Sequence, residues 1–306
     1  MKLIEQSVEL WEQTDMYQHI ERCARVCYQS EPKDTSSETF VNKLIANKHL
    51  AMLEHGTIYL KIPMELVTDA SDHSGYNRNK YSHVAEIYDI TTKDNNVIKL
   101  KCAYVTTNYR VLVENGWLDD LKYYKCEPTE FHERRITLKF TTSIGIVREL
   151  LRHRKFSFAN ESTRYCNYSK DKFDGEITFI KPYWCGAENP SAMMLFIDNL
   201  KRAEETYFDL VKGKTLKIVY KDDNNNEQIN DVSFTLLPPQ QAREVLPLCT
   251  KSELVMTGFT SDWKDFLDKR LFEKTGKVHP DMIDLCLKAK QVLEDNNLWK
   301  LIYKEN

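Results

Sequence analysis

Helical and strand-like segments follow one another in this chain without the regular strand–helix–strand alternation of a parallel α/β fold. Apolar residues recur near helical spacing in four segments, and two other segments alternate in the manner of strands. The helical segments are 16–30, 38–53, 191–212 and 240–302, and the clearest strands are 57–62 and 135–140. Such a mixture is typical of the α+β class, which is the fold class we expect here.

Turn and capping residues refine this outline. Pro63 ends the first strand, and Ser143 is suited to cap a helix that runs through residues 144–155. The polar run 222–226 predicts a turn between two strands, and the run 93–97 predicts another. The surrounding region, from about 66 to 135, has a less regular pattern.

The composition indicates a folded protein without a strong charge imbalance. The chain has 306 residues, of which 42% are hydrophobic, enough for a packed core. Its 43 Lys and Arg residues nearly cancel 46 Asp and Glu residues, leaving a net charge of -3. We therefore expect no nucleic-acid partner, and the absence of a long apolar run predicts no membrane partner.

The cysteines argue against a metal centre. Eight cysteines are scattered along the chain without a CxxC pair, whereas structural zinc ligands usually occur as close pairs. The N-terminal stretch MKLIEQSVELWEQ carries acidic residues where a signal peptide has its apolar run. We accordingly expect no metal and a cytoplasmic, reducing location.

Positive charge is concentrated in one segment, residues 148–165. The basic residues are Arg148, Arg152, His153, Arg154, Lys155 and Arg164, and the polar residues that follow them are Ser157, Asn160, Ser162 and Thr163. Guanidinium groups bind phosphate oxygens in pairs, and amides and hydroxyls recognise a base or sugar. The segment therefore favours a nucleoside monophosphate site, with a solvated basic helix face or a nucleic-acid-binding module as alternatives.

The residue order within this segment resembles the signature of flavin-dependent thymidylate synthases. Arg152-His153-Arg154, seven further residues and then Ser162 fit the pattern RHRx7S, and Thr163-Arg164-Tyr165 matches its usual continuation. Other segments resemble the family in the same order: 24–28 (ARVCY), His49 with 53–55 (LEH), 242–248 (AREVLPL) and 263–270 (WKDFLDKR). The resemblance covers roughly residues 16–62, 135–212 and 238–290.

This resemblance implies a single domain over residues 1–306, built on the family fold of a central, mostly antiparallel sheet with flanking helices. Relative to compact members, residues at about 66–134 and 213–236 look inserted. For these insertions we favour surface decoration or oligomer packing over a second active site. Members of the family are homotetramers whose active sites draw residues from several subunits, and we expect the same assembly here.

The implied reaction is the reductive methylation of dUMP to dTMP. NADPH reduces bound FAD, methylenetetrahydrofolate donates the carbon, and reduced flavin supplies the hydride that completes the methyl group. The family needs no cysteine nucleophile, so the eight cysteines are not catalytic candidates.

The resemblance also assigns residues to the nucleotide. Arginine suits both the phosphate and the negative charge that develops on uracil, whereas the signature serine lacks an evident activating base and is assigned to binding. The predicted catalytic residues are Arg152, Ser162 and Arg270. The predicted dUMP contacts are Glu149, Arg152, Glu161, Ser162, Thr163, Arg164, Arg243 and Arg270.

A second set is assigned to FAD by the same resemblance. The predicted contacts are Cys27, His49, Glu54, His153, Arg154, Lys155, Phe259, Ser261 and Asp265. For His55 we favour a structural role. Phe259 stands where many members have Asn, Ser261 where they have Arg, and Asp265 where a polar or amide residue is common. We therefore expect a shifted or weaker flavin site.

Two alternatives share the same scaffold. One is action on another pyrimidine nucleotide such as dCMP, because carboxylates at Glu149 and Glu161, beside Asn160, are able to accept from a cytosine amino group. The other is a nucleotide-binding relative without catalysis, to which the departures at Phe259 and Ser261 point.

Overall fold

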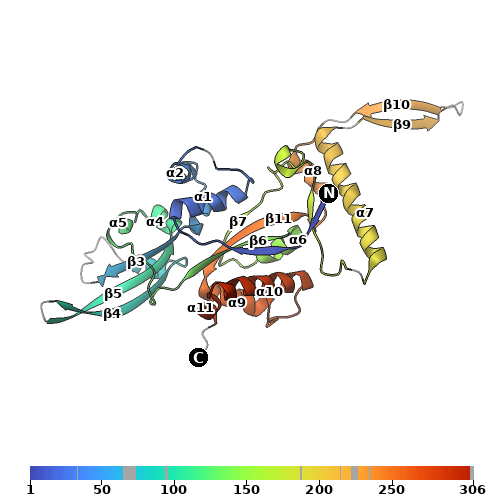
Figure 1. Ribbon diagram of the computed structural model, residues 1–306. Helices are drawn as coiled ribbons and strands as arrows, with labels where there is room; N and C mark the ends of the chain where they lie inside the picture. Colours follow the sequence, from blue (N-terminus) through green and yellow to red (C-terminus); the bar gives the residue numbers. More distant parts are fainter. Residues whose placement is uncertain are drawn as a thin grey trace. The chain divides into compact units, whose positions relative to one another are not determined.

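The chain forms two compact units (Figure 1). The computed structural model describes residues 1–303 except for 33, 65–73, 94–95, 187, 214, 222–226 and 234–235. The first unit consists of Met1–Ser7, Thr141–Leu150 and Glu161–Glu253, and the second of Val8–Phe140, Leu151–Asn160 and Leu254–Asn306. Helices and sheets are mixed in both, as expected for the α+β class. Among the described residues, no helix is long and apolar enough to cross a membrane.

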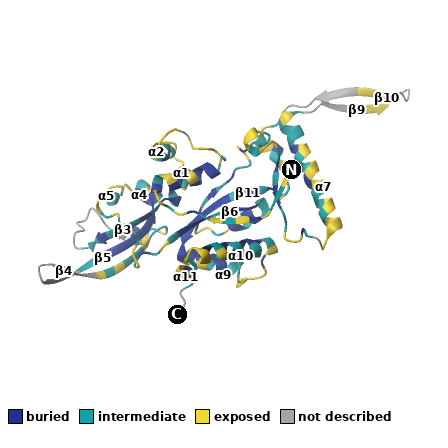
Figure 2. Cartoon of the chain, in the orientation of Figure 1, coloured by how far each residue is buried: buried dark blue, intermediate teal, exposed yellow. Residues whose placement is uncertain are grey.

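A four-stranded sheet with the strand order β2-β6-β11-β7 has most of its residues in the second unit. These strands are β2 (Ser7–Leu10), β6 (Arg135–Ser143), β7 (Ser157–Asn160) and β11 (Lys251–Phe259). β7 and β11 are antiparallel, with Ser157 opposite Thr257. The inner strands β6 and β11 are largely buried (Figure 2), because both of their faces are covered by helices.

One face of this sheet is covered by α1 (Met16–Val26), which Asp15 caps by accepting from the backbone N of Gln18 at 2.8 Å. Cys23 and Val26 of α1 belong to the same apolar cluster as Ala159 and Val255 of the sheet. The helix end is thus fixed by its cap, and its apolar side by burial against the strands.

The opposite face is covered by α9 (Thr260–Arg270), as Figure 1 shows. The Trp263 indole donates to the carbonyl of Ile136 at 3.1 Å, and its ring lies against Phe140 and Phe156 with centroid distances of 6.3 and 4.7 Å. The chain ends with α10 (Pro280–Asp295) and α11 (Trp299–Ile302).

The same unit contains a three-stranded antiparallel sheet with the order β3-β5-β4. Its strands are β3 (Thr57–Pro63), β4 (His83–Lys93) and β5 (Asn96–Asn108), and the surrounding helices are α2 (Ser37–Ala46), η1 (Leu50–His55), α3 (Ser74–Arg78), α4 (Tyr109–Asn115) and α5 (Asp120–Tyr123). The less regular pattern expected from about 66 to 135 therefore covers a regular antiparallel sheet. The strands predicted on both sides of the run 93–97 are confirmed as β4 and β5, and residues 94–95 lie outside the described residues. The two long strands mix polar and apolar residues because much of β4 is not buried, which obscures the alternating pattern.

The first unit packs around buried residues that include Phe179, Leu200 and Tyr207. Its elements are β1 (Lys2–Ile4) in parallel with β8 (Thr178–Ile180), α6 (Ile144–Leu150), η3 (Asp171–Phe173), α7 (Pro190–Lys212), α8 (Pro239–Ala242) and η4 (Arg243–Val245). The predicted strand pair in the second insertion is confirmed as β9 (Thr215–Lys221) and β10 (Glu227–Ser233). The predicted turn 222–226 lies outside the described residues.

Two further expectations need correction. Ser143 does cap α6, accepting from the backbone N of Ile146 at 3.2 Å, but the helix ends at Leu150 and not at 155. Three closely spaced cations follow, and mutual repulsion disfavours a helical turn there. In the predicted helical third 240–302, the run Lys251–Phe259 is strand β11, because a short apolar run is compatible with either structure.

Candidate functional site

The signature arginines lie in a loop between α6 and β7. Arg152 and Arg154 are exposed, and neither guanidinium makes a hydrogen bond or ion pair with another described residue. The Lys155 ammonium is 69% exposed and lies 3.7 Å from a carboxylate oxygen of Asp262. Because the helix stops before this loop, all three cations are accessible, which suits the binding of an anion such as a phosphate.

His153 of this loop contacts Arg270 at the end of α9. The Arg270 Nε donates to His153 Nε2 at 2.9 Å, which brings together two predicted site residues 117 positions apart. The imidazole edge also packs on Phe266 with a centroid distance of 4.9 Å. The pKa of His153 is lowered to about 4, mainly by burial and also by the neighbouring positive charges of Arg270 and Lys269. His153 is therefore neutral near pH 7 and acts as an acceptor that orients Arg270.

At the junction of β11 and α9, the polar groups are already bound within the chain. The backbone N of Phe259 donates to Asp262 at 3.3 Å, and that of Ser261 donates to Glu133 Oε1 at 2.9 Å. The carboxylate of Asp265 accepts from Lys269 at 2.7 Å. The three residues predicted to hold flavin at this junction, Phe259, Ser261 and Asp265, carry no positive charge with which to bind its diphosphate.

Two residues that the sequence analysis did not single out complete this junction. His83 of β4 stacks on the buried Phe259 ring at 4.3 Å, and its Nδ1 is ion-paired with Glu133. The hydrogen bond to Glu133 raises the pKa of His83. Burial opposes ionisation of Glu133, but hydrogen bonds from His83 and Ser261 outweigh it and lower its pKa to about 2. Both residues lie in the predicted insertion, where no motif distinguishes them.

The predicted N-terminal contacts are dispersed. Glu54 Oε1 accepts from Arg110 at 2.6 Å, whereas His49 is exposed at the start of η1. The Cys27 thiol lies 4.0 Å from the Met52 sulfur, and burial raises its pKa. A free thiolate at this position is therefore disfavoured.

His55 is fully buried and bonded within the chain, and the structural role favoured for it stays a prediction. Its Nδ1 lies 2.8 Å from the Thr257 hydroxyl, and the Thr257 hydroxyl is 2.8 Å from that of Thr137. His19 Nε2 lies 3.3 Å from Thr137, so two buried histidines join one polar chain through two threonines. Burial lowers the pKa of His55 to about 3 and that of His19 to about 4.

In the first unit, residues 162–165 form a turn that follows β7. The Ser162 carbonyl accepts from the Cys166 backbone N at 2.9 Å. The Thr163 hydroxyl accepts from Arg243 Nη1 at 3.0 Å, which joins the predicted nucleotide residues of two distant segments. Arg164 is exposed and its guanidinium lies over the Tyr165 ring. This part of the predicted site therefore offers two accessible arginines beside hydroxyl groups.

Glu161 has a different environment from the residues that follow it. Its side chain is fully buried, and its carboxylate accepts from Lys251 Nζ at 2.9 Å, the Tyr168 hydroxyl at 3.3 Å and the Glu253 backbone N at 3.1 Å. Burial raises the pKa of Glu161, and Lys251 counteracts part of that rise. A carboxylate with three internal donors is poorly placed to read a cytosine amino group. Glu149, half-buried on α6, is the other predicted base contact.

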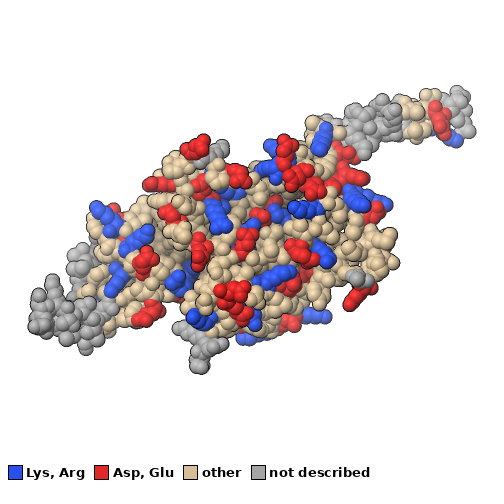
Figure 3. Space-filling view, in the orientation of Figure 1, with Lys and Arg blue, Asp and Glu red and all other residues tan. Residues whose placement is uncertain are grey.

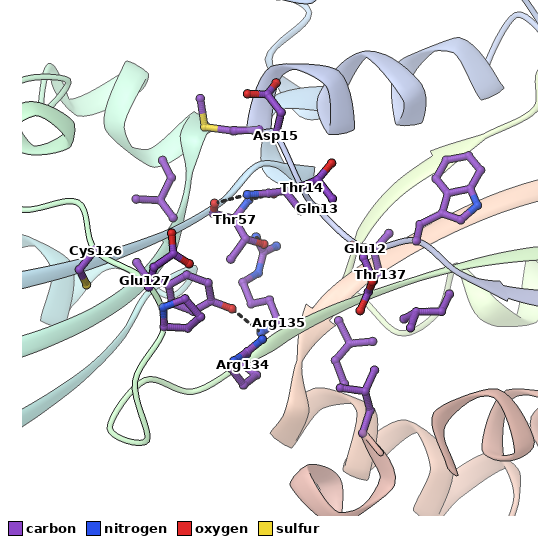
Figure 4. Close-up of a pocket in the computed structure, with 18 of the residues that line it drawn as sticks. Glu12, Gln13, Thr14, Asp15, Thr57, Cys126, Glu127, Arg134, Arg135 and Thr137 are labelled. Carbon is purple, nitrogen blue, oxygen red and sulfur yellow. Dashed lines mark hydrogen bonds between the residues drawn. The ribbon is translucent and has the colours of Figure 1, made fainter. Parts of the chain in front are cut away.

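The second unit also contains a cavity of about 380 Å³ that involves none of the predicted site residues (Figure 4). It lies between the N-terminal segment 10–16, β3, residues 125–128 and the start of β6. Gln13 closes one side, with its amide paired to the backbone N and O of Thr57 at 2.7 and 2.8 Å. Acidic and basic residues both line the cavity, so its charge alone indicates no ligand class.

The predicted catalytic residues are divided between the two units: Arg152 and Arg270 belong to the second and Ser162 to the first. Their assembly into one site stays a prediction. Acidic and basic side chains are interspersed on the face shown in Figure 3, in keeping with the small net charge. The local basic loop is thus a better indicator of anion binding than any global field.

Comparison with known proteins gives a family. The family described as thymidylate synthase complementing protein matches residues 127–293, more than half of the chain. A probable flavin-dependent thymidylate synthase of Paramecium bursaria Chlorella virus 1 is 24% identical over 156 residues, which cover 51% of this chain and 66% of that protein. The flavin-dependent thymidylate synthase of Corynebacterium glutamicum is 27% identical over 148 residues, covering 47% and 52% respectively.

The match thus spans less than two thirds of the length of these relatives. A crystal structure of the UMP/dUMP methylase PolB from Streptomyces cacaoi, bound with 5-Br dUMP, aligns over 96% of this chain and 93% of that chain. The identity between the two chains is 14% and the TM-score is 0.42.

Proposed function

The chain belongs to the thymidylate synthase complementing protein family, and we propose that it methylates dUMP to dTMP with a folate carbon and a flavin-borne hydride. The observation that carries this proposal is the pairing of the signature loop with α9, through the hydrogen bond from Arg270 to His153. A neutral histidine that holds an arginine beside two exposed arginines is a preorganised arrangement for a phosphorylated, anionic substrate.

The proposed roles follow from the chemistry of each group. Removal of the C5 proton from uracil places negative charge on the ring oxygens, which Arg270 is suited to stabilise as a fixed donor. Arg152, Arg164 and Arg243 are assigned to the phosphate and the pyrimidine, and the Thr163 hydroxyl positions Arg243 at 3.0 Å. Ser162 is assigned to nucleotide binding. Its hydroxyl accepts a hydrogen bond from the backbone N–H of Arg164, which cannot act as a general base to activate it.

The residues present fit a flavin on one side only. Arg154 and Lys155 are exposed cations suited to its diphosphate, and when bound and reduced by NADPH the flavin would supply the hydride. At the β11–α9 junction, Phe259 is buried and the backbone N of Ser261 is bound to Glu133. We therefore propose that the basic loop carries the cofactor and that the junction contributes shape more than hydrogen bonds.

We further propose that the enzyme works as a homotetramer with NADPH and methylenetetrahydrofolate as co-substrates. The resemblance to the family supports this assembly, in which arginines of several subunits meet at one nucleotide. Light scattering of the purified protein tests the assembly, and a monomer with full activity would contradict it.

The reaction is tested by release of tritium from C5-labelled dUMP in the presence of FAD, NADPH and methylenetetrahydrofolate. We expect release that depends on flavin and NADPH, is lost in Arg152→Ala and Arg270→Ala, and is retained in Arg202→Ala. Arg202 is a suitable control because its side chain is 75% exposed on α7. Absence of release from folded wild-type protein with excess FAD would refute the dUMP reaction.

A non-catalytic nucleotide-binding relative is the second candidate. The observation that favours it is the internal bonding of Ser261 and Asp265, which removes polar groups from the predicted flavin surface. Purified protein that stays colourless after addition of FAD, yet binds dUMP, would select this candidate over the enzyme.

A further inference from the structure

The first insertion forms a second, smaller pocket in the second unit. The pocket has a volume of about 280 Å³ and is lined by residues 78–81, which begin at the last residue of α3, by Asn108 at the end of β5, and by Arg110, Val111 and Glu114 of α4. Glu54, a predicted flavin contact, completes its wall. The insertion is thus placed against a residue of the predicted cofactor set.

The two asparagines of this pocket present donors. Asn79 Oδ1 accepts from the backbone N of Tyr81 at 2.9 Å, and Asn108 Oδ1 accepts from the backbone N of Val111 at 3.1 Å. Because each amide oxygen is already engaged, the NH₂ group is what each side chain has left to offer a ligand. A pocket with two such amides favours an acceptor-rich ligand.

The charges of the wall point the same way. Arg110 is paired with both carboxylates, at 2.6 Å to Glu54 and 2.9 Å to Glu114, and the hydrogen bonds to Glu114 and Glu54 raise its pKa. Arg78 and Lys80 are exposed and have no ion pair among the described residues. The lining therefore contains three cations and only two carboxylates, with the excess charge on the Arg78–Lys80 side.

The turn that carries these cations is held in place. The Ser82 hydroxyl lies 2.7 Å from that of Thr107 on β5, and the Ser82 backbone N donates to the carbonyl of Asn79 at 3.1 Å. Tyr76, just before the turn, is buried and its hydroxyl donates to Asp120 at 2.6 Å. The pocket is therefore largely preorganised, which lowers the entropic cost of binding.

We propose that this pocket binds a phosphate group of a nucleotide used in the reaction. Arg78 and Lys80 supply charge-assisted bonds, and the amides of Asn79 and Asn108 supply neutral donors. This inference rests on the proposed function for the identity of the ligand as a reaction nucleotide. It gives the insertion at about 66–134 a role beyond surface decoration.

The test compares binding of three ligand pairs whose members differ by one phosphate: NADPH with NADH, FMN with riboflavin as a probe of the flavin phosphate, and dUMP with deoxyuridine. Affinities are measured by calorimetry on the full-length protein and on Arg78→Ala/Lys80→Ala. For one of the pairs we expect the affinity ratio of the phosphorylated to the unphosphorylated ligand to be about tenfold or more lower in the variant than in wild type, since hydrogen bonds to charged groups are the strong ones. The affected pair identifies the nucleotide.

Two further variants sharpen the result. Lys43→Ala/Lys300→Ala removes the same charge from exposed positions elsewhere and should leave every pair within about twofold of wild type. Asn79→Asp keeps an oxygen for the Tyr81 N–H but replaces the NH₂ donor by a carboxylate, so it should weaken the same pair.

An unchanged phosphate advantage in all three pairs for Arg78→Ala/Lys80→Ala would overturn the inference. A decrease confined to one pair in a protein that does not release tritium from dUMP would support the pocket and refute the proposed methylation, so the two failures are distinguishable.

Discussion

Replacing Lys251 by methionine removes the cation that partners the fully buried carboxylate of Glu161. The Lys251 side chain is itself only 16% exposed, so water cannot readily take its place. Removing one partner of a buried ion pair typically destabilises a protein by about 3–5 kcal/mol. The Tyr168 hydroxyl and the Glu253 N–H still donate to the carboxylate, which places our expectation for Lys251→Met near the lower value, about 3 kcal/mol at pH 7.

The double variant Glu161→Gln/Lys251→Met removes both charges. We expect it to recover most of the lost stability, because the amide oxygen of glutamine still accepts from the Glu253 N–H and its NH₂ group is able to donate to the Tyr168 hydroxyl. Urea unfolding of wild type, both single variants and the double variant gives the coupling free energy directly.

The pH dependence of the single variant supplies an independent check. Burial already raises the pKa of Glu161 in the wild type, and loss of Lys251 should raise it further, so the folded variant holds this proton up to a higher pH than the folded wild type does. The destabilisation relative to wild type should therefore be small below about pH 4.5, where Glu161 is protonated in both folded proteins. It should grow above the wild-type pKa of Glu161, by up to about 1.4 kcal/mol per pH unit, until the pKa of Glu161 in the variant is passed. A Lys251→Met variant within about 1 kcal/mol of wild type at pH 7, or one with no change towards acid, would refute the reasoning.

Three further predictions concern the framework. The pKa values of buried His19 and His55 are lowered to about 4 and about 3, so they contribute stability above pH 6.5 that is lost as the pH falls towards 4. Unfolding followed by circular dichroism should show that the free energy of unfolding falls by about 1.4 kcal/mol per pH unit for each histidine in that window. A free energy of unfolding that does not change with pH would contradict this prediction. Gly258→Ala places a Cβ at 2.5 Å from the Phe156 ring and should cost about 1–3 kcal/mol in urea unfolding, whereas an unaffected midpoint would mean that the ring shifts freely. Ser143→Ala should cost about 1 kcal/mol through loss of the α6 cap, and a stability equal to that of wild type would show that the cap bond contributes nothing.

Local signals in the sequence predicted much of the secondary structure. Ser143 marks a helix start, Pro63 ends β3, and the polar run 222–226 lies between two strands, as expected. Such residues act on their immediate neighbours in the chain, so their effect is readable without tertiary information.

What the sequence could not show depends on distant contacts. The apolar run of β11 is compatible with a helix until its pairing with β7 is known, and the mixed polarity of β4 hides its strand character. Within the predicted site, the resemblance assigned His153 to FAD and Arg270 to the nucleotide, and the structure places the two residues in contact. The resemblance could not reveal that Glu161 is ion-paired with Lys251, nor that His83 stacks on Phe259. Lys251 and His83 both come from segments outside the motifs.

The division of the chain has a consequence for how the protein is made. Each unit is assembled from three separate stretches, so the chain crosses between the units five times, and three of these crossings fall within strands β2, β6 and β11. No single continuous piece of the gene therefore encodes either unit. During synthesis the first unit lacks its final stretch until residue 253 has left the ribosome, and the second until its C-terminal helices have emerged. Nascent chains shorter than this expose incomplete sheet edges, which makes them candidates for protection by chaperones.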